Sequence, residues 1–225
     1  MTAQWRRQWH EGTLGATDPM FPVGVVGIGP QTSSGANSWL IRQGQTADYG
    51  YLPNPAMPST FFTSAYDLPN PPGTKCFSGC VHIFNKKEVG RRLVLAGLRH
   101  AYNSPDSPAA PADPPLPTAA VLAAGGQVKV SFDRQIVMNT EHGASPTGSF
   151  LGWELLDATG AATAATYVAS DATSVTVAAA GCAAPTQARY AFADSPCPNL
   201  ACAFYGAGTR LPSPPFVVNV TSAAA

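Results

Sequence analysis

The residue best placed to do chemistry in this 225-residue sequence is His82. It lies in a turn-rich loop between a predicted strand over residues 60–68 and a predicted helix over residues 85–102. In α/β enzymes, the loop that follows the carboxyl end of a strand displays catalytic side chains over a cleft. A histidine takes up and returns a proton near neutral pH, which is how acyl-transfer hydrolases activate a serine. The structural alternative, a histidine hydrogen-bonded at the start of a helix, is favoured by spacing alone.

Asp67, at the end of the same predicted strand, is the candidate acid partner of His82. A carboxylate in that place can fix the tautomer of an imidazole and stabilise its protonated form. A backbone carbonyl is another way to orient the ring. The acid member of the site therefore stays open between these two groups.

Two further groups of polar and aromatic residues precede that strand. Arg42 and Gln45 lie three residues apart in a helix predicted over residues 38–47, so they share one face. The Pro/Gly-rich loop over residues 48–58 contains Tyr49, Tyr51 and Asn54. Aromatic and amide side chains suit a pyranose ring, although the same composition is common in ordinary turns.

Three segments give the sequence a family resemblance. Residues 45–62, residues 189–200 and the run from His82 to Leu93 resemble segments of sialate O-acetylesterases, and the likeness is weakest over residues 103–149. The resemblance implies an SGNH-type carboxylic ester hydrolase that removes O-acetyl groups from sialic acid or related sugars, with His82 as general base.

The resemblance also implies roles for the other candidate residues. Arg42 and Gln45 match an Arg-x-x-Gln pair near the active-site mouth that would orient substrate, and a solvated arginine on a surface helix is the alternative for Arg42. A secreted or lysosomal location is likewise implied. From the composition of their loop, and not from the resemblance, Tyr51 and Asn54 are expected to line a sugar site.

The sequence departs from the family pattern in two ways. Relatives have an aspartate two or three residues before the histidine, where this chain has Gly79 and Cys80, and Ile83 replaces the usual proline. The family's serine nucleophile belongs to an N-terminal block expected before Met1, and the serines of this chain lack the Gly-x-Ser-x-Gly and Gly-Asp-Ser settings. We therefore expect a C-terminal half that is inactive alone. There are two alternatives: a non-catalytic sugar-binding or interaction module, and a fragment from an incomplete gene model.

Composition limits the partners. Charged residues make up 12% of the chain and balance to a net charge of zero, so nucleic acid and anionic membranes are not expected to bind. No apolar run reaches the roughly 18 residues of a membrane span. The expected partners are an O-acetylated sugar and the missing N-terminal half of the enzyme.

The five cysteines form two local pairs, Cys76/Cys80 and Cys197/Cys202, with one thiol left over. Neither pair has the two-residue gap of a metal knuckle, and we expect neither a metal nor a cofactor.

The pattern along the chain predicts two domains. Residues 1–102 are predicted to form the C-terminal part of an SGNH-type α/β/α esterase domain, beginning with a helix that docks through Trp5 and Trp9, followed by a strand within residues 21–29. Residues 103–117 read as a Pro-rich linker. Residues 118–225 are predicted to form an all-β antiparallel sandwich that packs against the first domain. Its expected strands begin at Val128, Trp153, Thr166, Ser174, Arg189 and Phe216.

Overall fold

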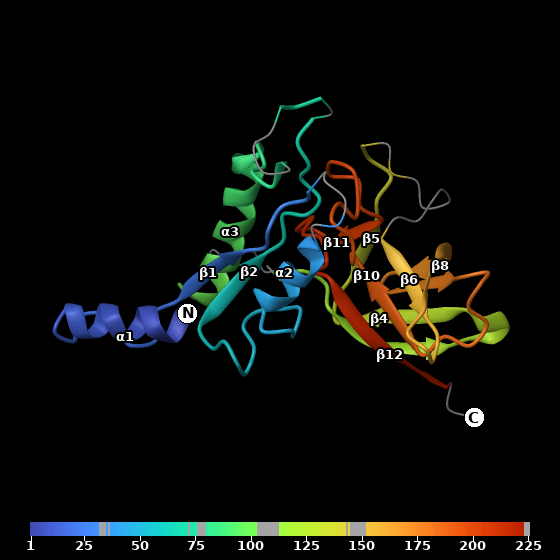
Figure 1. Cartoon of the computed structure of the whole chain (residues 1–225), viewed down its shortest axis with the longest axis horizontal. Helices are drawn as coiled ribbons and strands as arrows, with labels where there is room; N and C mark the ends of the chain where they lie inside the picture. Colours follow the sequence, from blue (N-terminus) through green and yellow to red (C-terminus); the bar gives the residue numbers. More distant parts are fainter. Residues whose placement is uncertain are drawn as a thin grey trace.

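In the N-terminal part of the chain, the described residues form two short parallel strands and three α-helices (Figure 1). The computed structural model describes residues 1–31, 35, 37–71, 73–75, 80–102, 113–142, 144 and 152–222. Its first elements are α1 (Thr2–Gly12), β1 (Val23–Val26), α2 (Ser38–Gly44), β2 (Thr60–Thr63) and α3 (Lys86–His100). Strands β1 and β2 pair in parallel, with Val23 beside Thr60 and Val26 beside Thr63.

Helix α3 packs closely on this strand pair because Gly24 of β1 has no side chain at the contact. A Cβ atom added to Gly24 would lie 2.6 Å from the ring of Phe61 and 3.2 Å from the side chain of Leu93. The helix begins where the side chain of Asn85 accepts a hydrogen bond from the backbone N–H of Glu88, as helix-capping rules predict. The predicted helix over residues 85–102 is therefore confirmed nearly to its ends.

Helix α1 docks through a different face from the predicted one. Trp5 and Trp9 are 45% and 62% exposed, whereas Arg6 is buried. The Arg6 guanidinium donates hydrogen bonds to the backbone oxygens of Phe21, at 3.0 Å, and Ser59, at 2.7 Å. The prediction of aromatic docking is wrong because two backbone carbonyls near the start of β1 and β2 bind the arginine face.

The rest of the chain is β-rich, as predicted. One sheet has the order β7-β6-β10-β12-β3-β4-β9-β8, and β11 and β5 form a separate antiparallel pair. The strands are β3 (Pro117–Leu122), β4 (Val128–Phe132), β5 (Ile136–Met138), β6 (Trp153–Leu156), β7 (Ala162–Ala164), β8 (Thr166–Asp171), β9 (Ser174–Ala178), β10 (Gln187–Tyr190), β11 (Phe204–Gly206) and β12 (Phe216–Ser222).

The eight-stranded sheet is mixed and nearly closed. Strands β7 and β8 lie at its two ends in the strand order, yet only Ala165 separates them in the sequence. The sheet must therefore curl until its two ends approach each other. Strands β12 and β3 pair in parallel, with Val220 beside Ala120, so the predicted all-antiparallel sandwich is corrected to a mixed sheet.

Aromatic side chains fill the curled sheet. Trp153 is 1% exposed, and its ring lies 5.0 Å from Tyr190, 5.9 Å from Phe204 and 5.6 Å from Phe216, measured between centroids. Tyr66, from the N-terminal part, belongs to the same core. The two predicted domains are thus packed together. None of the described helices is long and apolar enough to cross a membrane.

Candidate functional site

The predicted site lies at the carboxyl end of β1 and β2. The chain leaves β1 through Ile28 and Gly29, and a Cβ added to Gly29 would lie 2.8 Å from the carbonyl oxygen of Val81, the neighbour of His82. The close approach of two backbones requires glycine here. Gln45 fixes the same segment, because its amide accepts from the Ile28 N–H at 2.9 Å and donates to the Val26 carbonyl at 3.0 Å.

Arg42 lies on the other side of this segment and is buried. Four of its N–H groups donate to backbone carbonyls: those of Ile28 at 3.0 Å, Gly29 at 3.1 Å, Ala193 at 2.7 Å and Asp194 at 2.8 Å. Burial lowers the pKa of the guanidinium to about 10. Arg42 therefore joins the end of β1 to the segment that follows β10, and this geometry is that of a structural residue.

Replacing Arg42 with methionine is expected to destabilise the protein by about 2–4 kcal/mol, because four backbone carbonyls, all partly or fully buried in their bonds to Arg42, lose their charged donor. Urea denaturation monitored by circular dichroism measures the change. Arg99→Met is the matched control, since the side chain of Arg99 is 52% exposed in its pair with Asp113 and should cost about 1 kcal/mol or less. Equal losses for the two variants would contradict the structural role of Arg42.

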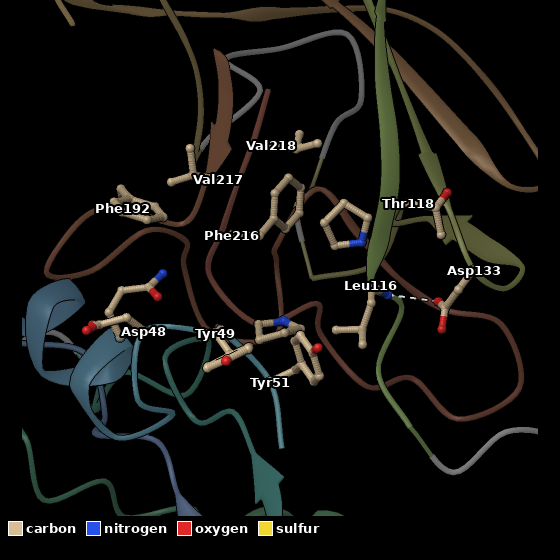
Figure 2. A pocket seen from close by; sticks show the side chains of 14 residues that line it. Asp48, Tyr49, Tyr51, Leu116, Thr118, Asp133, Phe192, Phe216, Val217 and Val218 are labelled. Carbon is tan, nitrogen blue, oxygen red and sulfur yellow. Dashed lines mark hydrogen bonds between the residues drawn. The ribbon is translucent and has the colours of Figure 1, made fainter. Parts of the chain in front are cut away.

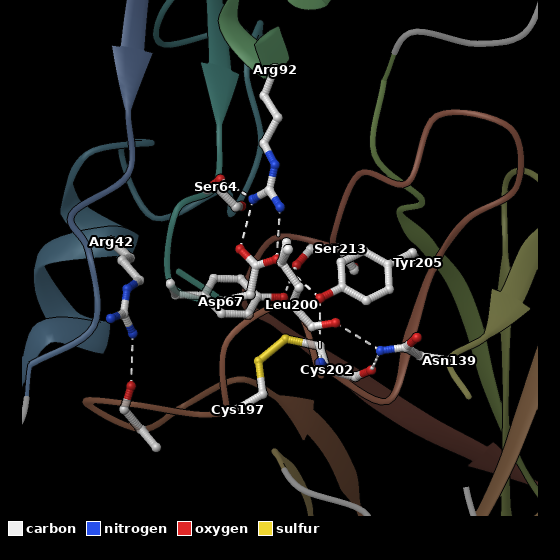
Figure 3. Close-up of a disulfide and its surroundings, with 12 residues drawn as sticks. Arg42, Ser64, Asp67, Arg92, Asn139, Cys197, Leu200, Cys202, Tyr205 and Ser213 are labelled. Carbon is white, nitrogen blue, oxygen red and sulfur yellow. Dashed lines mark hydrogen bonds and ion pairs between the residues drawn. A yellow bond between two sulfur atoms is a disulfide. The ribbon is translucent and has the colours of Figure 1, made fainter. Parts of the chain in front are cut away.

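Asp67 lies in a buried ion pair (Figure 3). Its two carboxylate oxygens accept from Arg92 Nη1 at 2.6 Å and Nη2 at 2.7 Å, and the Tyr205 hydroxyl donates to one of them at 3.0 Å. Arg92 also donates to the Ser64 carbonyl at 2.9 Å and to Glu88 at 2.8 Å. Burial opposes the charge on Arg92, but its hydrogen bonds to Asp67 and Glu88 raise its pKa above the ordinary value.

The structure does not join Asp67 to His82. The carboxylate of Asp67 binds Arg92 and Tyr205, and no hydrogen bond connects it to the imidazole. His82 is exposed, and its ring makes no hydrogen bond with the described residues. The backbone of the loop is fixed instead, because the Asn70 side chain donates to the His82 carbonyl at 3.0 Å and accepts from the Phe84 N–H at 2.7 Å.

Tyr51 and Asn54 lie away from His82. Asn54 is buried, and its amide binds the carbonyls of Thr46 and Tyr51 and the N–H groups of the turn that follows it. Asn54 therefore has the ordinary turn role that the sequence analysis gave as the alternative to sugar binding. The loop containing both residues precedes β2, whereas His82 follows it, so the two lie toward opposite ends of the strand.

The cysteine predictions are partly tested. Cys197 and Cys202 form the predicted disulfide, next to the Asp67 network (Figure 3). Cys80 is also disulfide-bonded, and its predicted partner Cys76 lies outside the described residues. Cys182 is a buried free thiol. Among the described residues, no group of three or more histidine, cysteine, aspartate or glutamate side chains is arranged to hold a metal ion.

Sequence reasoning missed the residues that hold the site in place. The spacing of Glu88 and Arg92, four residues apart on a helix, was an available sign of an ion pair. Asn70 stands between two prolines in a loop, and Tyr205 comes from a strand that was not predicted. Neither of these two had a sequence signal that pointed to the histidine loop or to Asp67.

Comparison with known proteins gives consistent matches. Residues 124–220 match the family model of the sialate O-acetylesterase C-terminal domain. Over 226 residues, the chain is 29% identical to the sialate O-acetylesterases of Mus musculus and Homo sapiens. The matches cover 96% of this chain but 39% of the mouse protein and 40% of the human protein, so the chain spans about two fifths of their length.

A solved structure shares the fold. The chain superposes on a carbohydrate acetylesterase from Xanthomonas citri with a TM-score of 0.65 and 23% identity, over 96% of this chain and 46% of that one. In sequence the chain is therefore similar to the C-terminal part of the sialate O-acetylesterases, and residues 124–220 match the model of their C-terminal domain.

Proposed function

We propose that this chain is the C-terminal part of a carbohydrate O-acetylesterase in which His82 is the general base. The observation that best supports the proposal is an exposed imidazole just beyond the carboxyl end of β2, on a loop held by Asn70. That edge of a parallel sheet is where α/β enzymes bind their ligands. The proposed substrate is an O-acetylated sugar.

The small sheet supports a further part of the proposal. Among the described strands, β1 and β2 pair only with each other. Parallel strands are normally found in larger sheets covered on both faces. We therefore propose that a segment outside these 225 residues supplies further strands of an SGNH-type α/β/α layer, together with the serine nucleophile.

In the proposed reaction, the serine hydroxyl attacks the acetyl carbonyl and its proton passes to the imidazole of His82. The sugar oxygen leaves with that proton, and an acetyl-enzyme ester remains. Water then attacks this ester, His82 again takes the proton and returns it to the serine, and acetate leaves. Because Arg92 and Tyr205 already bind the carboxylate of Asp67, a backbone carbonyl or a group on the other segment is the better candidate to orient the ring.

Arg42, Gln45 and Asp67 have indirect roles in this proposal. Arg42 and Gln45 shape the segment over residues 28–29 beside the histidine loop, and Asp67 fixes the end of β2. Arg42 and Asp67 are buried, and the Gln45 amide binds the backbone at Val26 and Ile28. The competing proposal is a non-catalytic sugar-binding module. It is supported by a cavity that Tyr51 and other aromatic residues line.

The chain alone is expected to release no acetate from O-acetylated sialic acid or from acetylated neutral sugars, because a histidine without an activated serine cannot follow the covalent route. Acetate release is measured for the wild-type chain and for His82→Ala, which should both match the blank. A cooperative thermal transition of the same samples verifies that they are folded and counts against the gene-fragment alternative. Acetate release that disappears in His82→Ala would show that these 225 residues contain the nucleophile.

A further inference from the structure

A cavity of about 620 Å³ opens between the loop over residues 48–51 and the curled sheet (Figure 2). Tyr49 and Tyr51 form one side of it, and Phe216 and Val218 of β12 lie across from them. Its size falls within the range of small-ligand sites in proteins. The cavity lies on the side of the small sheet where β2 begins, so it is separate from the His82 loop.

The two tyrosines form an exposed aromatic platform. Tyr49 is 47% exposed and Tyr51 36% exposed, and their rings meet edge to face with centroids 6.0 Å apart. Exposed rings beside polar groups are suited to the apolar faces and hydroxyl rim of a pyranose. Gln43 and Thr118 contribute an amide and a hydroxyl to the same lining.

The loop that presents the tyrosines is held in one conformation. Asp48 and Gly50 both have left-handed backbones, with φ of 66° and 79°. The Gly50 N–H donates to the Thr46 hydroxyl at 2.9 Å, and a Cβ on Gly50 would lie 2.9 Å from the Pro215 carbonyl oxygen. Only glycine allows this approach. The platform therefore needs little ordering when a ligand binds, which favours affinity.

The charges of the lining select against acidic sugars. No lysine or arginine is among its described residues, and its two charged side chains are the carboxylates of Asp48 and Asp133. Asp133 is paired with Arg134 at 2.5 Å, whereas Asp48 is exposed and has no ion pair within the described part of the chain. A sugar carboxylate would meet an uncompensated negative charge.

A second cavity, of about 200 Å³, continues from the first and shares Tyr51, Leu116 and Pro214 with it. Its charged groups are paired, because Asp113 contacts His100 at 2.5 Å and Arg134 at 3.7 Å. The two cavities together provide room for more than one sugar unit along the tyrosine platform.

The two cavities form one groove, lined on one side by Tyr49 and Tyr51. We propose that this groove binds a neutral oligosaccharide of uncharged pyranose units. The tyrosine rings stack on the sugar, and Gln43 and Thr118 bind hydroxyl groups. Such a site holds a glycan at a distance from the His82 loop. Binding here does not require ester hydrolysis, so it is tested independently of the catalytic proposal.

The test is titration calorimetry of the whole chain with four neutral hexasaccharides: xylohexaose, cellohexaose, mannohexaose and chitohexaose. At least one is expected to bind with a Kd below about 1 mM. Tyr51→Ala should weaken that binding at least about tenfold, whereas Tyr51→Phe, which keeps the ring, should stay within about threefold. Tyr102→Ala is the matched control, because Tyr102 is 78% exposed and is not part of the described lining.

The anionic trisaccharide 3′-sialyllactose tests the charge argument. It is expected to bind at least about tenfold more weakly than the best hexasaccharide, and Asp48→Asn should narrow that difference. The proposal is overturned if none of the four hexasaccharides binds at about 10 mM. It is equally overturned if Tyr51→Ala binds as the wild type does, or if sialyllactose binds more tightly than every neutral sugar.

Discussion

Replacing Arg92 with methionine is expected to destabilise the protein by about 3–5 kcal/mol, since the substitution leaves the buried carboxylate of Asp67 without its cation. Both side chains of this pair are fully buried. The Tyr205 hydroxyl, which donates to Asp67 at 3.0 Å, cannot replace a bidentate guanidinium. The free energy of unfolding from urea titration measures the loss.

Arg91→Met is the matched control for this prediction. Arg91 is the next residue of α3 and also pairs with Glu88, at 2.7 Å, but its side chain is 42% exposed. An exposed pair contributes about 1 kcal/mol or less. A double variant, Arg92→Met with Asp67→Leu, should recover part of the loss because no buried charge remains unpaired. If Arg92→Met and Arg91→Met cost the same, the buried pair has no special role.

This ion pair connects α3, the end of β2 and β11 in one buried network. Arg92 comes from α3, Asp67 follows β2, and Tyr205 comes from β11 (Figure 3). Next to it, the Tyr66 hydroxyl donates to the Ser213 carbonyl at 2.5 Å. The end of β2 is therefore anchored on the β-rich part of the chain.

Local patterns predicted most of the regular elements. The apolar stripe over residues 89–98 identified α3, and short segments separated by turn residues identified six strands of the β-rich part. Strands β3, β5, β7 and β11 were missed: β5, β7 and β11 are each three residues long, and β3 and β7 each contain two alanines, which have a low strand propensity. Strand pairing depends on contacts between distant residues, so the parallel pairing of β12 with β3 had no local signal.

The face through which a helix docks is harder to predict than the helix itself. In α1, the aromatic side chains favoured burial through Trp5 and Trp9, but the carbonyls of Phe21 and Ser59 bind Arg6 instead. Those acceptors lie far away in the sequence. Periodicity alone therefore could not identify the buried face.

The same limit applies to the candidate site. The sequence predicted that His82 lies on a loop that follows a strand. In the structure, His82 is exposed on the loop that follows β2. It could not show that Arg92 binds the carboxylate of Asp67, or that backbone carbonyls occupy Arg42. The role of a buried polar residue depends on its hydrogen-bond partners, and those partners come together only in the folded chain.

The role of His82 is tested most directly by extending the protein upstream of Met1 through the in-frame coding sequence and measuring acetate release from an O-acetylated sugar. We predict a Gly-Asp-Ser block in that sequence and an active esterase. His82→Ala should lower kcat/KM at least about a thousandfold. His142→Ala, which removes another exposed histidine, 47% accessible at its side chain, should change it little. An upstream sequence without such a block, or an extended esterase that keeps its activity in His82→Ala, would contradict the account.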